Sequence, residues 1–149
     1  MYVPRKSEYA LRALFELSRR YGQGSVKLAE IARAQAIPPA FSDAILIQLK
    51  QRGFVASRRG RDGGYAMVRS PEKLTVGEVV RFIQGPVGPV KCVEEGPKDD
   101  CPLYETCVFL PMWEKVRRAI LDVFDNTTLR DLVEQQAKKT VTYVPSYSI

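Results

Sequence analysis

Residues 28–41, LAEIARAQAIPPAF, decide the fold that this 149-residue chain is expected to adopt. The apolar spacing over residues 27–35 predicts a short helix, which a brief turn follows. Pro38 and Pro39 mark the start of a longer helix, because proline is tolerated in the first helical turn and not later. This helix is expected to run to about Arg52. A short helix, a tight turn and a longer helix form the helix-turn-helix pattern.

The next stretch predicts a β-hairpin. Residues 54–58 and 65–69 can each form a strand, and the glycines between them supply the positive φ angles that a hairpin tip needs. Arg58, Arg59 and Arg61 crowd this tip. A hairpin directly after a candidate recognition helix is a wing, whose arginines can enter the minor groove or bind phosphates. The alternative is a solvated, arginine-rich turn.

The remainder of the chain is predicted to be mostly helical. Thr75 can cap a helix, since Glu78 stands three residues later in capping-box spacing. Further helices are expected over residues 5–21, 108–124 and 129–139. The predicted fold class is mainly α with a small β-hairpin wing, a winged helix-turn-helix followed by a long C-terminal dimerisation helix. The expected parts are a DNA-binding domain (1–85), a cysteine loop (86–107), dimerisation helices (108–140) and a loosely held tail (141–149).

Charge is unevenly distributed along the chain. The net charge is +6, but residues 1–70 carry 13 Lys and Arg against 5 acidic residues, whereas residues 71–149 carry 10 against 12. The basic half is where a phosphate backbone would bind, and a solvated basic surface is the alternative. No apolar run reaches membrane-spanning length and the start has no signal-peptide core. We therefore expect a cytoplasmic protein without a membrane partner.

The helix over residues 108–124 carries a narrow apolar seam. Its residues are Met112, Trp113, Val116, Ile120 and Val123. The expected partner of this seam is the same helix of a second copy, which makes the protein a homodimer. The alternative is that the helix folds back on its own domain.

Three cysteines and the absence of histidine limit the catalytic and metal-binding chemistry that the chain can perform. Without histidine the chain excludes Ser-His-Asp catalysis and histidine-ligated metals, so an enzyme is not expected. Cys92, Cys101 and Cys107 have eight and five residues between them, wider than the spacing of zinc knuckles. Thiolates are soft ligands, and wide spacing suits a loop around an iron–sulfur cluster. Zinc held by three cysteines and a carboxylate, or direct thiol oxidation, remain the alternatives.

Several residues are candidates for DNA contact. The first part of the longer helix would face the major groove with Ala40, Phe41, Ser42 and Asp43, although Phe41 can equally belong to the core. Asp43 could accept a hydrogen bond from a cytosine amino group. Phosphate contacts are expected from Lys27, Lys50 and Arg52, and a dimer would bind a pseudo-palindromic operator on double-stranded DNA.

Most of the chain, about residues 3–138, resembles a known bacterial family. The strings that carry the resemblance are SEYALRAL (7–14), LAEIARAQAIPPAF, RRGRDGGYAM (58–67), LTVGEVVRFIQG (74–85), CPLYETC (101–107) and TTLRDLV (127–133). The family is that of the redox- and iron–sulfur-sensing winged-helix repressors typified by IscR and NsrR. The resemblance implies a homodimer whose operator binding is gated by an iron–sulfur cluster that senses redox, iron–sulfur status, oxygen or nitric oxide.

The resemblance also points to a fourth ligand for the cluster. The IscR type has a histidine three residues after the last cysteine, where this chain has Leu110. The NsrR type uses an acidic residue near the N-terminus of the partner subunit, and Glu8 stands at the matching place. Glu8 can also be an ordinary first-turn acid that stabilises its helix. Three thiolates leave one iron held by oxygen or open, which favours a [4Fe-4S] over a [2Fe-2S] cluster.

Overall fold

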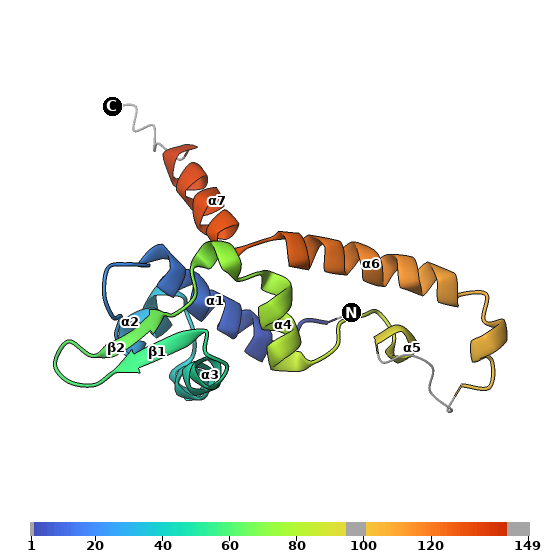
Figure 1. Ribbon diagram of the computed structural model, residues 1–149, viewed down its shortest axis with the longest axis horizontal. Coiled ribbons are helices and arrows are strands. Elements are labelled where there is room, and N and C mark those ends of the chain that lie inside the picture. The colour runs from blue at the N-terminus through green and yellow to red at the C-terminus, as the bar shows by residue number, and fades with distance from the viewer. Residues whose placement is uncertain (1, 95–100, 143–149) are drawn as a thin grey trace, which may run out of the picture.

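The computed structural model describes residues 2–94 and 101–142, and confirms the predicted fold class. The helices are α1 (Arg5–Arg19), α2 (Leu28–Ala34), α3 (Pro39–Gln51), α4 (Val76–Gln84), α5 (Lys91–Glu94), α6 (Leu110–Asn126) and α7 (Leu129–Thr142). Strands β1 (Val55–Arg58) and β2 (Gly64–Met67) form an antiparallel hairpin, and single 3-10 turns occur at Pro71–Lys73 and Tyr104–Thr106. The body contains α1 to α4 and the hairpin, and α6 extends from it as a long arm (Figure 1).

Helix α1 is the centre of the hydrophobic core. Ala10, Ala13 and Leu14 are fully buried, and α1 contacts α2, α3, α4, α7 and β2. Phe54, at the end of the helix-turn-helix, packs edge-on against Phe82 of α4 with ring centroids 5.6 Å apart. The core therefore fixes the position of the helix-turn-helix relative to α4.

A buried carboxylate fixes α1 to the helix-turn-helix. The side chain of Glu16 is fully buried and accepts hydrogen bonds from Arg19 at 3.0 Å, Arg20 at 2.9 Å and the Gln35 amide at 2.8 Å. Burial alone would raise the pKa of Glu16, but the hydrogen bonds from Gln35 and the two arginines outweigh it and hold the pKa below its usual value. Gln35 is the residue that ends α2, so this charge holds the turn of the helix-turn-helix in place.

The hairpin is attached to the body by an isolated β-bridge. The backbone groups of Val26 and Tyr65 exchange two hydrogen bonds of 2.8 Å. Gly64 makes this approach possible, because its φ is +152° and a Cβ there would lie 2.3 Å from the Val26 carbonyl oxygen. The wing is therefore held against the segment that precedes α2.

The junction between α6 and α7 returns to the body. Leu129 is fully buried, and its N–H donates to the Leu74 carbonyl at 3.0 Å while Val76 N–H donates to Thr127. Thr75 caps α4 as predicted, because its hydroxyl accepts from the Glu78 N–H at 3.2 Å. The Glu78 carboxylate differs from the expected capping box, since it pairs with Arg69 instead.

The cysteine segment is more structured than predicted. The expected loop over 86–107 contains α5, which carries Cys92, and the 3-10 turn just before Cys107. Helix α7 continues to Thr142, past the expected helix end at 139, and the rest of the predicted tail, residues 143–149, lies outside the described residues. None of the helices in the described ranges is long and apolar enough to cross a membrane.

We expect Glu16→Gln to lower the free energy of unfolding by about 1–3 kcal/mol, because it leaves two arginines without their shared anion. The pKa of Glu16 lies below its usual 4.5 in the folded chain, so the network stabilises the fold above that pH. Its contribution fades as the pH falls through the folded pKa. Urea unfolding at pH 7 and at pH 3.5 measures both effects.

The matched control is Glu134→Gln on α7, where an exposed glutamate also pairs with an arginine. This change should have little effect, since exposed ion pairs contribute little. Equal losses in the two variants would contradict a structural role for the buried carboxylate.

Candidate DNA interface and thiol site

The outer face of α3 is the first part of the candidate interface. Ala40, Asp43, Ala44, Ile47 and Gln51 are all exposed along it, and Ile47 is 44% exposed. The opposite face buries Ile45, Leu46 and Leu49 in the core. A helix with one face free in a helix-turn-helix has the form that enters a major groove.

Ser42 corrects the expected set of groove-facing residues. It is only 3% exposed, and its hydroxyl donates to the Pro39 carbonyl at 3.1 Å. Its position on α3 is one turn before Leu46 on the buried side, so it cannot lie on the outer face with Asp43. Phe41 lies at the border of the two faces, 46% exposed, with its ring centroid 5.6 Å from that of Tyr9.

Three exposed residues of α3 were missed by the sequence reasoning, namely Ala44, Ile47 and Gln51. The signal was present, because a helical wheel that places Ile45 and Leu49 inward puts these three opposite. The predicted base contacts were confined to the first turn of the helix, and only Lys50 and Arg52 were expected to contact phosphates from its end. The free face in fact extends along the whole of α3.

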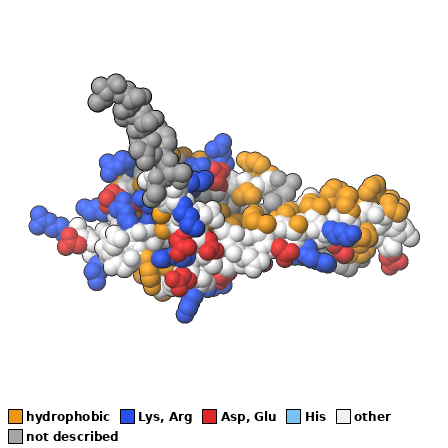
Figure 2. Space-filling view, turned by 90° about the horizontal axis from the view of Figure 1, so that it is seen from above, with side chains coloured by type: hydrophobic (Ala, Val, Ile, Leu, Met, Phe, Trp, Pro, Cys, Tyr) orange, Lys and Arg blue, Asp and Glu red, His pale blue; other side chains and the backbone are white. Residues whose placement is uncertain are grey.

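Basic side chains flank this face. Lys27, at the start of α2, is exposed, and Lys50 near the end of α3 donates to the Ser57 hydroxyl of β1 at 2.6 Å. Arg58, Arg59 and Arg61 are exposed at the end of β1 and in the turn of the hairpin, as Figure 2 shows for the basic groups at the tip. Exposed cations therefore occur at the start of α2, near the end of α3 and on the wing.

The arm formed by α6 has two different faces. One packs on α4, where Ile120 contacts the buried cluster of Val76, Val80 and Val87. The other presents apolar side chains to solvent, with Val116 at 38% and Val123 at 64% exposed, and Met112 beside them. Trp113 is half-buried. Figure 2 shows hydrophobic side chains running along the arm.

Two of the three cysteines, Cys101 and Cys107, precede the outer end of this arm, whereas Cys92 on α5 lies beside the middle of α6. All are free thiols; Cys92 and Cys107 are half-buried and Cys101 is exposed. Cys92 lines a cavity of about 440 Å³ together with Tyr104, Arg117 and Leu121. Arg117 also donates from Nε to the Val87 carbonyl at 3.1 Å, which anchors the segment before α5 to α6.

Among the described residues, no three side chains of Cys, Asp or Glu are grouped closely enough to hold a metal. The sequence-predicted ligands are therefore not brought together within one copy. Their chemistry still fits a thiophilic centre, because each thiol is free and the segment that carries them is fixed at one end by Arg117.

Glu8 lies in the first turn of α1 and belongs to no group of potential metal ligands among the described residues. Its carboxylate, about half-exposed, pairs with the Arg12 guanidinium one turn later. Arg12 also donates to the Gln35 carbonyl at 3.4 Å and lies over the Tyr9 ring. A single arginine therefore joins Glu8 to the turn between α2 and α3.

Comparison with known proteins gives the family that this geometry resembles. Residues 3–135 match the family model Rrf2, described as an iron-dependent transcriptional regulator. A putative Rrf2-like helix-turn-helix regulator of Rhodobacter capsulatus is 35% identical over 88% of this chain and 91% of its own length. NsrR of Bacillus licheniformis is 30% identical over 91% and 94% of the two chains.

Two solved structures share the fold over almost the whole chain. CymR of Bacillus subtilis, titled a global cysteine regulator, has a TM-score of 0.76 and 28% identity, and covers 91% of this chain and 98% of its own. IscR of T. potens has a TM-score of 0.73 and 28% identity, covering 99% and 95%. These relatives are named as regulators of transcription and not as enzymes.

Proposed function

Because this chain belongs to the Rrf2 family of transcriptional regulators, we propose that it is a homodimeric repressor whose operator binding is gated by an iron–sulfur cluster. Membership of this family makes the chain a DNA-binding regulator with a helix-turn-helix. The proposal that a cluster gates operator binding is supported by the position of the three free thiols. Cys101 and Cys107 come just before the helix whose apolar face is uncovered, and Cys92 lies beside the middle of the same helix.

The proposed DNA binding rests on the exposed face of α3 and on the cations of α2, α3 and the wing. Asp43 and Ala40, on the free face, would contact base edges, while Lys27 and Lys50 would bind phosphates and set the register. Phe41 would reach a thymine methyl from the border of the face. In the wing, Arg58, Arg59 and Arg61 would enter the minor groove or clamp its phosphates.

The homodimer half rests on α6. Exposed apolar side chains four and seven residues apart on a projecting helix favour a helical partner with the same pattern. Met112, Val116 and Val123 would form the centre of that interface, with Trp113 and Ile120 at its edge. The two winged helices of the dimer, related by two-fold symmetry, would then bind a pseudo-palindromic operator.

The cluster would be held by Cys92, Cys101 and Cys107, with Glu8 of the partner subunit as a fourth ligand. Such a cluster supplies a redox-active centre that oxygen or nitric oxide can attack. Cluster binding would also have to draw the three thiols of one copy together, because they are not grouped among the described residues. Four irons are favoured over two, because an oxygen ligand leaves one iron weakly held.

Arg12 offers a connection from this centre to DNA. It orients Glu8 through their ion pair and binds the carbonyl of Gln35, which ends α2. A change at Glu8 therefore alters the partners of Arg12 directly at the helix-turn-helix turn. Gln35 is also a donor to Glu16, so the turn is anchored on both sides.

A thiol-based or zinc-based regulator is the second candidate. It is favoured by the exposure of Cys101, which leaves that thiol open to oxidants, and by the similarity to CymR, whose Staphylococcus aureus homologue has a solved structure titled as an oxidised form. In this alternative the DNA interface and the dimer helix keep the same roles.

We expect Arg59→Ala and Arg61→Ala to weaken operator binding by about 1–3 kcal/mol where the arginine contacts a base. Arg130→Ala on α7, which Figure 1 places on the side of the body away from α3, is the matched control and should leave affinity unchanged. Titration of a labelled operator fragment at fixed salt measures all three. Unchanged affinity in both wing variants would refute the role of the wing.

We expect Cys101→Ala to abolish iron loading while the protein stays a folded dimer, because this exposed thiol contributes little to packing. Anaerobic reconstitution followed by iron analysis and sedimentation velocity measures both properties. Thr106→Ala, in the same segment, should keep its iron. Loss of the dimer in Cys101→Ala would mean that the cysteine is structural.

A further inference from the structure

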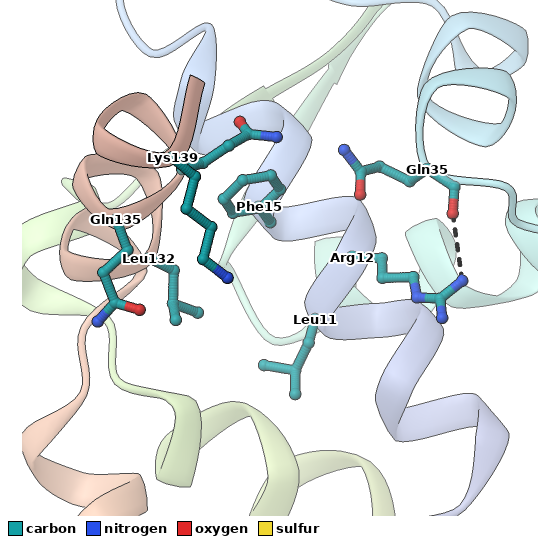
Figure 3. A pocket seen from close by; sticks show the side chains of 8 residues that line it. Leu11, Arg12, Phe15, Gln35, Leu132, Gln135 and Lys139 are labelled. Atoms are coloured by element: carbon teal, nitrogen blue, oxygen red, sulfur yellow. Dashed lines mark hydrogen bonds between the residues drawn. The ribbon is translucent and has the colours of Figure 1, made fainter. Parts of the chain in front are cut away.

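A groove between α1 and α7 is distinct from the thiols and from the DNA face. It is open to solvent and has a volume of about 430 Å³, within the range of small-molecule sites. Figure 3 shows Leu11 and Phe15 on α1 facing Leu132 and Lys139 on α7, with Arg12 and Gln35 at the opposite edge. The groove therefore brings together residues more than a hundred positions apart in the sequence.

The lining combines an apolar floor with cations. Leu11, Phe15 and Leu132 supply the floor, and glutamines of α7 supply amide groups at the rim. The described residues that line the groove include two basic side chains and no carboxylate. An apolar ligand with a negative end matches this distribution of charge.

The two cations are not equivalent. Arg12 already pairs with Glu8 and with the Gln35 carbonyl, which reduces its capacity for another anion. Lys139 has no ion-pair partner within the described part of the chain, and Figure 3 shows its ammonium group directed toward the hollow. Lys139 is therefore the main anchor that the groove offers to an anion.

We propose that this groove binds a small amphipathic carboxylic acid, with its carboxylate on Lys139 and the edge of Arg12 and its hydrocarbon body on Leu11, Phe15 and Leu132. A charge-assisted hydrogen bond to an ammonium group fixes the head of the ligand. Burial of the hydrocarbon against three apolar side chains supplies the rest of the affinity. This site contains none of the cysteines and none of the residues on the outer face of α3, and it shares Arg12 and Gln35 with the contacts that join Glu8 to the helix-turn-helix.

The test uses sodium octanoate as the probe and the full chain as the protein. Isothermal titration calorimetry should show saturable binding at or below roughly millimolar concentration. Lys139→Met removes the anchor but keeps a long helix-forming side chain, and should weaken binding at least about tenfold. Lys138→Met removes the same charge one residue earlier on α7, outside the groove, and should change affinity by less than about twofold.

Methyl NMR of the same samples locates the probe. The methyl signals of Leu11 and Leu132 should shift on saturation with octanoate. Shifts confined to Met112, Val116 and Val123 would show adsorption to the exposed face of α6 and overturn the proposal. Equal weakening in the two lysine variants, or an absence of saturable binding, would also overturn it.

Sedimentation in the presence of octanoate excludes another occupant. The distribution of oligomers should not change, since the groove is formed within one copy by α1 and α7. Conversion of dimer to monomer by octanoate would mean that a second copy fills the groove, which contradicts the proposal. None of these measurements depends on iron or DNA, so their failure would leave the proposed function standing.

Discussion

The buried carboxylate of Glu16 is the constraint on which the DNA-reading arrangement depends. A charge removed from water must be matched by donors, and the donors here come from α1 itself and from Gln35. Arg20 extends the network by donating to Glu30 of α2 at 3.3 Å. The angle between α1 and the helix-turn-helix is therefore fixed by a directional network in addition to apolar packing, which is not directional.

Helix α6 connects the parts of the molecule that the proposed mechanism needs. Its inner face packs on α4, and an ion pair of 2.7 Å joins Arg81 of α4 to Asp125 near its C-terminal end. Its outer face is apolar and exposed, and its N-terminal end follows the thiols. A change at the thiols and a change of partner at the outer face would both reach the DNA-binding body through this one helix.

The sequence predicted what depends on neighbours along the chain. The local signals are the helical period, the prolines at the start of α3, the Thr75 cap and the glycine-rich wing. The structure has the predicted helix, cap or hairpin at each of these places. It did not predict α5, whose four residues are too few for a periodic pattern, or the burial of Ser42, which depends on how α3 packs. The network of Glu16 and the α1–α7 groove join distant segments, so no local pattern could indicate them. The ligand set stays a prediction, because the three cysteines are not grouped among the described residues of one copy and Glu8 would come from a second copy.

The most direct test of the account is the absorption spectrum of anaerobically purified protein, with iron, acid-labile sulfide and zinc quantified per monomer. The account predicts iron and sulfide in comparable amounts together with visible charge-transfer bands, lost in the variant without Cys101. A colourless protein that carries zinc, or no metal after reconstitution, would contradict cluster gating. It would leave a winged-helix regulator that works through a structural metal or through its thiols alone.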